Sequence, residues 1–123
     1  MSTSTPSTVL LDHTQDKVVV LDESGTFNYV SAAAERILGF EPDELVGENA
    51  FEYIHPAERS AVRETFGSVI DEREFAAETT AYRHRASDGS WVWLESRMSN
   101  LTDEALDGYV VSSRDITDRV EAE

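Results

Sequence analysis

The chain contains no cysteine among its 123 residues. That absence excludes disulfides, thiolate metal ligands, cysteine nucleophiles and cofactors held through a thioether bond. The chain also lacks any apolar run near the roughly 18 residues that cross a bilayer, and it lacks a charged and then apolar leader. We therefore expect a cytoplasmic domain without direct membrane contact.

Basic residues are scarce. Ten Lys and Arg stand against 25 Asp and Glu, which gives a formal net charge of −15, and Lys17 is the only lysine. An acidic excess of this size repels phosphate backbones and anionic lipid, so we expect no binding of nucleic acid. Because 40% of the residues are hydrophobic and fall in ordered patterns, the charge does not indicate disorder. We interpret it as halophilic adaptation, since high salt screens self-repulsion.

Residue sets typical of metal and catalytic sites are also missing. The three histidines (His13, His55 and His84) are scattered, and we predict no metal site. His55 stands before a proline at a predicted helix start and is expected to cap that helix rather than bind haem. His84 is flanked by Arg83 and Arg85, whose charge disfavours a metal ion. No phosphate-binding glycine loop or nucleophile motif occurs, so we expect no enzymatic activity.

The hydrophobic pattern predicts five strands and three short helices in the order β-β-α-α-α-β-β-β. Ser31 is expected to cap the first helix. One antiparallel sheet with short helices over one face is an α+β fold, and the concave space between the two layers suits a ligand. The predicted strands span residues 17–22, 26–30, 75–86, 90–101 and 109–115, and the predicted helices span 31–39, 42–47 and 56–71.

We expect a single domain at residues 13–118. Residues 1–12 are predicted to be a flexible lead-in, and residues 119–123 to begin a helix that continues toward an output domain. Trp91 and Trp93 share a face of their strand. Either the apolar residues 9–11 or a second chain is expected to cover that face, so a homodimer is predicted, although core packing also explains both tryptophans.

Several short motifs recur in a fixed order along the chain, and together they cover nearly all of residues 17–119. Their order and spacing resemble the PAS/PAC sensor domain family, of the kind found in haloarchaeal signal-transduction proteins. The motifs are Asp22-x-x-Gly25, Tyr29-Val30-Ser31-x-Ala33-Ala34, Leu38-Gly39-Phe40, Glu44-Leu45-Val46-Gly47, Ile54-His55-Pro56, Asp88-Gly89 with Trp91-x-Trp93, and Asp115-Ile116-Thr117.

The resemblance implies a PAS fold, with a five-stranded antiparallel sheet of strand order 2-1-5-4-3. It also implies a sensory or interaction module of the kind associated with histidine kinases and two-component systems. In such domains the closing Asp115-Ile116-Thr117 segment joins the last strand to the outgoing helix and bonds back near the end of the first strand. We assign Asp22, Asp115 and Thr117 to signal relay, with Arg97 or Arg114 as expected partners of Asp115.

A ligand pocket is expected between the sheet and the helices. Hydroxyl groups among apolar neighbours favour a small neutral aromatic or heterocyclic ligand, because no basic pair clearly faces inward and the bulk charge opposes an anion. Core packing explains each position taken alone. The candidate pocket residues are Val20, Ile37, Leu38, Leu45, Phe51, Ile54, Val62, Phe66, Thr80, Tyr82, Leu94, Met98, Val111 and Ser113.

Three functions remain open at this point. The leading one is a sensor that binds a small molecule and relays its state to an output domain of the same protein. The second is a ligand-free protein-interaction or dimerisation module with a filled core. The third is a cofactor-bearing redox or gas sensor. Haem and covalent flavin are not expected as cofactors, whereas non-covalent flavin stays open.

Overall fold

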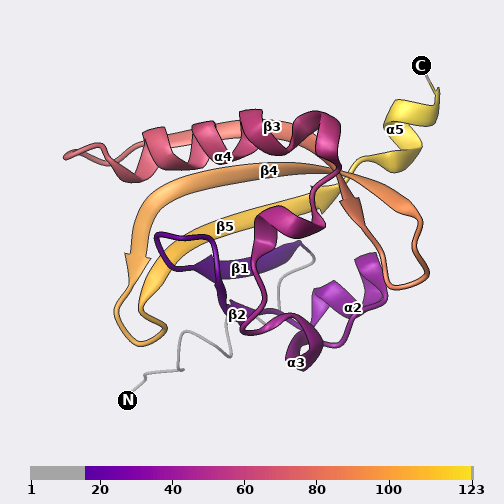
Figure 1. Ribbon diagram of the computed structural model, residues 1–123, viewed down its shortest axis with the longest axis horizontal. Helices are drawn as coiled ribbons and strands as arrows, with labels where there is room; N and C mark the ends of the chain where they lie inside the picture. Colours follow the sequence, from indigo (N-terminus) through magenta and orange to yellow (C-terminus); the bar gives the residue numbers. More distant parts are fainter. Residues whose placement is uncertain (1–15, 123) are drawn as a thin grey trace, which may run out of the picture.

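The computed structural model describes residues 16–122, which form one antiparallel sheet with a helical layer (Figure 1). The expected lead-in at residues 1–12 and His13 lie outside the described residues. In chain order the elements are β1 (Lys17–Leu21), β2 (Phe27–Val30), α2 (Ala33–Leu38), α3 (Pro42–Leu45), η1 (Ala50–Tyr53), α4 (Pro56–Ile70), β3 (Ala77–Arg85), β4 (Trp91–Asp103), β5 (Gly108–Asp115) and α5 (Thr117–Ala122).

The sheet has the strand order β2-β1-β5-β4-β3, which confirms the predicted PAS fold. All neighbouring strands are antiparallel. All five residues of β1 are buried, as expected for the strand that lies between β2 and β5 and is covered on both faces. For this reason Val18-Val19-Val20-Leu21 is a continuous apolar run and does not alternate between apolar and polar residues.

The turn between β1 and β2 is fixed by one carboxylate and one glycine. Oδ1 of Asp22 accepts hydrogen bonds from the backbone N–H groups of Ser24 and Thr26, each at 2.9 Å. Gly25 has φ 90°, a backbone conformation that only glycine adopts without strain. These backbone hydrogen bonds and that of the Ser24 hydroxyl hold the pKa of the Asp22 carboxyl below its ordinary value, against the opposing effect of burial.

The helical layer crosses one face of the sheet, with α4 running along β3 and β4 (Figure 1). Pro56 occupies the first turn of α4, and Nδ1 of His55 accepts from the N–H of Ala57 at 3.0 Å, so the predicted capping role of His55 is confirmed. Ser31, in contrast, does not cap α2. Its fully buried Oγ accepts from the N–H of Val18 at 2.9 Å and so ties β1 to the start of the helical layer.

The core lies between α4, η1 and the sheet. The buried stripe of α4 is Val62, Phe66 and Val69, as its spacing predicts. The Phe66 ring meets the Phe51 ring edge-on, with centroids 5.7 Å apart. Burial of side chains of this size contributes about 1.5–3 kcal/mol each. Leu45 and Leu94 complete the same cluster with no exposed surface.

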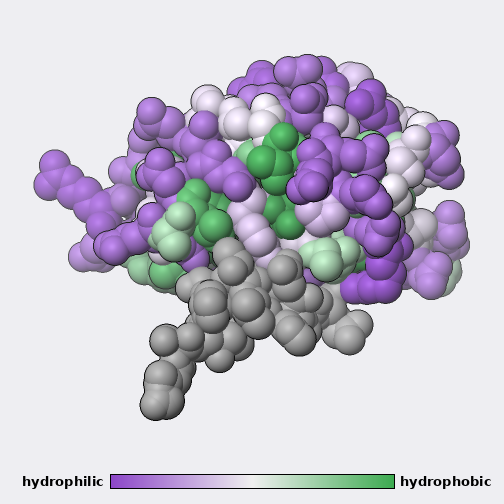
Figure 2. Space-filling view, turned by 90° about the horizontal axis from the view of Figure 1, so that it is seen from below, coloured by the Kyte–Doolittle hydropathy of each residue, from purple (hydrophilic) through white to green (hydrophobic). Residues whose placement is uncertain are grey.

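Hydrophilic side chains cover most of the face seen in Figure 2, in keeping with the net charge of −15. Within residues 16–122 no helix is long and apolar enough to cross a membrane.

Candidate functional site

An internal cavity of about 20 Å³ lies between the sheet and η1. A volume of this size holds roughly one water molecule. Every residue that lines it is buried, so the cavity lies within the core. The lining residues are Lys17, Val19, Leu21, Phe27, Ala50, Phe51, Ile54, Tyr82, His84, Met98, Val111 and Ser113.

Six of the fourteen predicted pocket residues line this cavity. Four more belong to the surrounding core cluster, and two pack at its margin or beside it. The lining residues are Phe51, Ile54, Tyr82, Met98, Val111 and Ser113, those of the cluster are Leu45, Val62, Phe66 and Leu94, and the other two are Ile37, half-buried against the cluster, and Leu38, buried outside it.

The remaining two predicted positions do not line this cavity. Val20 is fully buried, but strand alternation places it on the sheet face opposite to Val19 and Leu21, which line the cavity. The apolar run of β1 hides this alternation, so the sequence alone does not show which face Val20 occupies. Thr80 lies on the inner face of β3 but reaches a surface hollow beside α4 rather than the cavity.

Lys17 brings a positive charge into the core. Its residue surface is only 2% exposed, and its Nζ lies 5.8 Å from the centroid of the Phe27 ring. Burial lowers the pKa of the Lys17 ammonium from 10.5 to about 8. The three ion pairs found within residues 16–122 do not include Lys17, and none of the cavity-lining residues is acidic.

His84 brings an unsatisfied nitrogen to the same cavity. Its Nδ1 lies 2.8 Å from the carbonyl oxygen of Arg85, which can only accept, so Nδ1 carries the proton and Nε2 is an acceptor. Within the described residues, Nε2 of His84 is the one buried side-chain polar atom without a hydrogen-bond partner. Burial and, secondarily, the Lys17 charge lower the pKa of His84 from 6.5 to about 3.

Three hydroxyl groups form a chain on the sheet side of the cavity. The Tyr82 and Ser96 hydroxyls share a hydrogen bond of 2.7 Å, and the Ser96 and Ser113 hydroxyls share one of 2.6 Å. Each of these residues is buried. Burial raises the pKa of the Tyr82 phenol above its ordinary value, so the hydroxyl remains a neutral donor.

Lys17 and His84 are the site residues that the sequence prediction missed. The expectation that no basic pair faces inward is therefore wrong, and a flat aromatic ligand does not fit a cavity of about 20 Å³ without rearrangement. Strand alternation was the available signal, because Lys17 lies two residues from Val19 and His84 two residues from Tyr82. The flanking Arg83 and Arg85 alternate with His84 along β3 and therefore belong to the opposite face of the strand.

The exit segment (Asp115–Thr117) leaves the sheet at the Lys17 end of the cavity. The N–H of Ile116 donates to the carbonyl of Trp93 at 2.9 Å, and Oγ1 of Thr117 accepts from the N–H of Trp93 at 3.1 Å. Oδ1 of Asp115 accepts from the N–H of Thr117 at 2.8 Å. The exit segment is therefore anchored to the beginning of β4, and not to the end of the first strand as the resemblance implied.

The structure does not bring the predicted relay residues and the expected arginine partners of Asp115 together. Asp22 follows Leu21, which pairs with Tyr109 at the opposite end of β5 from Asp115, so the predicted relay residues do not meet. Arg114 is bound to Glu95 at 2.6 Å instead of Asp115. Arg97 lies 5.8 Å from the centroid of the Phe75 ring. Both arginines thus have other partners on the outer face of the sheet.

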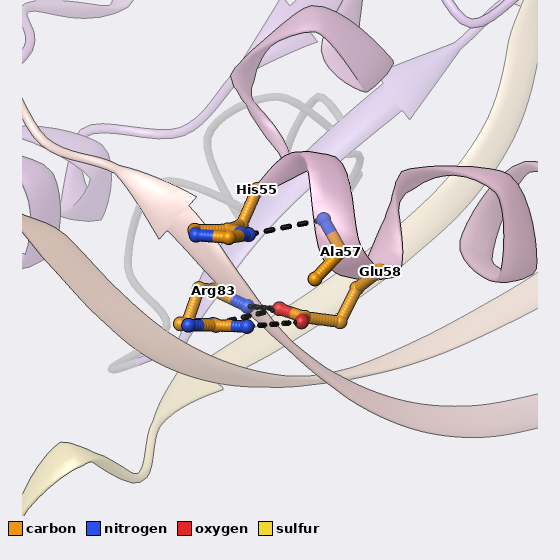
Figure 3. A network of polar contacts seen from close by, with 4 residues as sticks. All are labelled: His55, Ala57, Glu58 and Arg83. Atoms are coloured by element: carbon orange, nitrogen blue, oxygen red, sulfur yellow. Dashed lines mark hydrogen bonds and ion pairs between the residues drawn. The ribbon is translucent and has the colours of Figure 1, made fainter.

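The N-terminus of α4 is clamped to the edge of β3 beside His84. Glu58 accepts hydrogen bonds from the backbone N–H and the guanidinium of Arg83, with the shortest ion-pair contact at 2.5 Å (Figure 3). These bonds lower the pKa of the Glu58 carboxyl. The N–H of His55 donates to the carbonyl of Arg83 at 2.9 Å. Together these contacts fix the strand residue that precedes His84.

Larger hollows lie on the surface and differ in chemistry from the cavity. One of about 420 Å³ lies between the β1–β2 turn and the β4–β5 turn and is lined mainly by carboxylates. Another of about 450 Å³ lies between α4 and β3 and is lined mainly by acidic and hydroxyl side chains. Among the described residues that line these two hollows, none is basic and none has an unsatisfied buried polar atom.

The sheet order, the helical layer and an enclosed cavity beneath it define a small sensor-type domain. A family model described as PAS fold matches residues 11–121. The chain belongs to this family, and it is a PAS domain of the sensor and signalling type. Domains of this family are generally sensory or interaction modules rather than catalysts.

The curated relatives that match the chain include animal proteins. The chain is 35% identical over 79 residues to human Basic helix-loop-helix ARNT-like protein 2, covering 64% of this chain and 12% of the relative. It is 32% identical over 96 residues to human Basic helix-loop-helix ARNT-like protein 1, covering 75% and 15%. The chain therefore spans only about an eighth of the length of these relatives.

Solved PAS domains show the same fold. A PAS domain from Colwellia psychrerythraea has a TM-score of 0.77 at 22% identity, covering 90% of this chain and 94% of that one. The PAS domain of the Cronobacter turicensis quorum-sensing receptor RpfR, in complex with BDSF, has a TM-score of 0.67 at 20% identity, covering 85% and 97%. Drosophila melanogaster Cycle PAS-B, with bound ethylene glycol, has 0.66 at 22%, covering 80% and 96%.

Proposed function

We propose that this domain binds a small molecule in the cavity lined by Lys17 and His84 and passes the bound state through the exit segment to an output domain of the same protein. The observation that carries this proposal is a buried ammonium beside an unsatisfied nitrogen: none of the three ion pairs found within residues 16–122 includes Lys17, and Nε2 of His84 has no hydrogen-bond partner among the described residues. A buried polar group without a partner costs about 1–3 kcal/mol, and more when charged. A core kept only for packing gains nothing from either group.

The connection between cavity and exit is short. Ser113 faces the cavity and stands two residues before Asp115 on the same strand. Its hydroxyl is bound to Ser96 on β4, and β4 also supplies Trp93, to which Ile116 is bound. A ligand that moves β5 relative to β4 therefore strains the bonds that set the direction of α5. Small shifts in packed cores are transmitted in this discrete way.

A protein-interaction module is the second candidate, and the small cavity volume favours it. Phe75 and Leu101 are 64% and 55% exposed and line one surface hollow of about 380 Å³. Exposed apolar side chains that lie together mark interaction surfaces in other proteins. The predicted homodimer belongs to this candidate.

Native mass spectrometry of the purified chain separates the two candidates. We expect a small-molecule adduct on the wild-type chain or, if purification removes it, binding of at least one of propionate, propionamide or indole by saturation-transfer NMR. Val111→Ile, which adds one methylene to the cavity wall, should weaken that binding. Ser112→Ala, on the neighbouring outer-face position, is the matched control.

A folded wild-type chain with neither adduct nor probe binding would overturn the sensor proposal. A concentration-dependent dimer in sedimentation equilibrium, weakened by Phe75→Ser, would then support the interaction module.

A further inference from the structure

The cavity has a polar end and an apolar end. Lys17 and Ser113 are direct partners across β1 and β5, and both line the cavity where His84 also reaches it. Two residues further along β1, Val19 pairs with Val111, and both are apolar. A complementary occupant therefore has one polar group at the Lys17 end and an apolar remainder.

The two basic groups require opposite hydrogen-bonding partners. The Lys17 ammonium has only donors, so it needs an acceptor. Nε2 of His84 is an acceptor in its neutral tautomer, so it needs a donor. An ionised carboxylate alone satisfies Lys17 but places a second acceptor against Nε2. The occupied site must therefore contain one proton more than the empty site and the free carboxylate.

We propose, on the basis of the proposed sensor function, that the cavity recognises a short aliphatic monocarboxylic acid, with Lys17 donating to one carboxyl oxygen and one proton held between the other oxygen and Nε2 of His84. The Ser113 hydroxyl lies at the same end and supplies a further donor. The aliphatic part lies against the apolar end. Met98 lines that end, and because a cavity of about 20 Å³ holds roughly one water molecule, the flexible Met98 side chain has to move to admit the aliphatic part.

Other ionisable groups near the pair do not supply this proton. From β3, the Tyr82 phenol is already engaged with Ser96, and the Arg85 cation lowers the pKa of His84. From η1, the Tyr53 ring stacks on His84 with centroids 5.7 Å apart. With the pKa of Lys17 at about 8 and that of His84 at about 3, the empty site carries one charge at neutral pH. The proton consumed on binding therefore comes from solvent.

The proposal fixes how binding depends on pH. Between about pH 5 and 7.5 the free acid is ionised, Lys17 is charged and His84 is neutral, so binding takes up about one proton and the dissociation constant rises about tenfold per pH unit. A ligand of five heavy atoms binds no tighter than about the micromolar range, and a millimolar constant is the realistic scale. The neutral amide of the same acid carries its own donor and should bind without this pH dependence.

The test is a titration of the chain with propionate and with propionamide at several pH values, followed through the side-chain ¹⁵N signals of His84. We expect propionate to shift Nε2 toward its protonated position, with an affinity that falls about tenfold per pH unit. Sodium chloride at the same ionic strength should leave Nε2 unshifted.

Two variants isolate the proposed contacts. Lys17→Met removes the charge but keeps the length of the side chain, and it should abolish propionate binding while the chain stays folded. Arg97→Met removes one positive charge from an exposed position and should leave binding unchanged. His84→Asn keeps a donor for the Arg85 carbonyl and should leave weaker, pH-independent binding.

Several outcomes would overturn the proposal. Binding of propionamide or indole at the cavity without any binding of propionate would overturn it and leave the sensor function standing. An equal shift with chloride would show a general anion site. Propionate binding that persists in Lys17→Met, or that does not depend on pH, would contradict the proposed geometry. No binding by any probe would overturn both proposals.

Discussion

Lys17 and Ser113 lie opposite each other across β1 and β5, and both side chains face the cavity. The pair joins the one lysine of the chain to the strand that ends at the exit segment. Because Lys17 pairs directly with a residue of β5, a ligand that binds next to the Lys17 charge also contacts or displaces β5. Four consequences can be measured without knowing the ligand.

The buried histidine should make the domain sensitive to mild acid. The pKa of His84 is about 3 in the folded chain, whereas an ordinary histidine, as in the unfolded chain, has a pKa of 6.5. Between these two pH values the unfolded chain therefore binds more protons than the folded chain. The free energy of unfolding should therefore fall as pH drops below 6.5, by at most about 1.4 kcal/mol per pH unit. Urea unfolding of wild type and of His84→Asn between about pH 7 and 5 checks this. In that range the carboxyl groups with lowered pKa values stay ionised, so they do not add to the pH dependence. Equal slopes would contradict it.

The buried lysine should act in the alkaline range. The pKa of Lys17 is about 8 in the folded chain against an ordinary 10.5, so the unfolded chain again binds more protons between these values. Stability should rise with pH from about 8 to 9.5, before the tyrosines titrate. Lys17→Met should be more stable than wild type at pH 7 by about 1–3 kcal/mol, because it removes a buried charge that no ion pair within the described residues includes, and the difference should shrink as the pH rises. Arg97→Met is the control, and a destabilised Lys17→Met would refute the assignment.

Substitutions at two glycines with the same backbone conformation allow the cost of backbone strain to be separated from the cost of a steric clash. Gly25 and Gly47 have φ values of 90° and 92°. A Cβ at Gly25 would meet the Phe51 ring at 2.3 Å, whereas one at Gly47 meets nothing within 4 Å. Gly47→Ala should cost about 1–2 kcal/mol of stability for its backbone alone. Gly25→Ala should cost at least about 1 kcal/mol more, because the Phe51 ring must move. Thermal unfolding of both variants gives the comparison. Equal losses of stability would contradict the prediction, because they would mean that the Phe51 ring moves aside at no cost.

The anchor of the exit segment should depend on one hydroxyl. Thr117→Val keeps the shape but removes the acceptor for the N–H of Trp93, at a cost of about 1 kcal/mol. Amide exchange in α5 should accelerate severalfold while the sheet is unchanged. Thr79→Val, at an exposed position of β3, is the control. Asp115→Ala should loosen α5 in the same way through the N–H of Thr117. Unchanged exchange in both variants would mean that α5 is held by other contacts.

Much of the fold follows from local pattern. The glycine turns, the amphipathic spacing of α4 and the motif order are each local, and they predicted the strand order correctly through the family resemblance. The cavity depends instead on which face each strand turns inward. In β1 the run Val18-Val19-Val20 hides the alternation, so the sequence does not show that Val20 faces away from the cavity. Lys17 and His84 are charged types that composition assigns to the surface, and only packing shows that both are buried.

The exit segment shows the same limit. Its sequence predicted a joint between the last strand and an outgoing helix, and α5 begins at Thr117, two residues before the start predicted for that helix. Its partner could not be predicted, because the contact with Trp93 joins residues 24 positions apart. The three-residue motif specifies a local carboxylate cap, but the strand that receives it is set by the sheet register.

In the proposed sensor, a ligand bound in the cavity changes the hydrogen bonds that anchor the exit segment to β4. The most direct test is the exchange rate of the Ile116 amide, which is bound to the Trp93 carbonyl, measured with and without saturating propionate at mildly acidic pH. We predict a change of at least severalfold in wild type and Arg97→Met, and none in Lys17→Met. An Ile116 rate that stays the same while the His84 signals show a filled cavity would contradict the account.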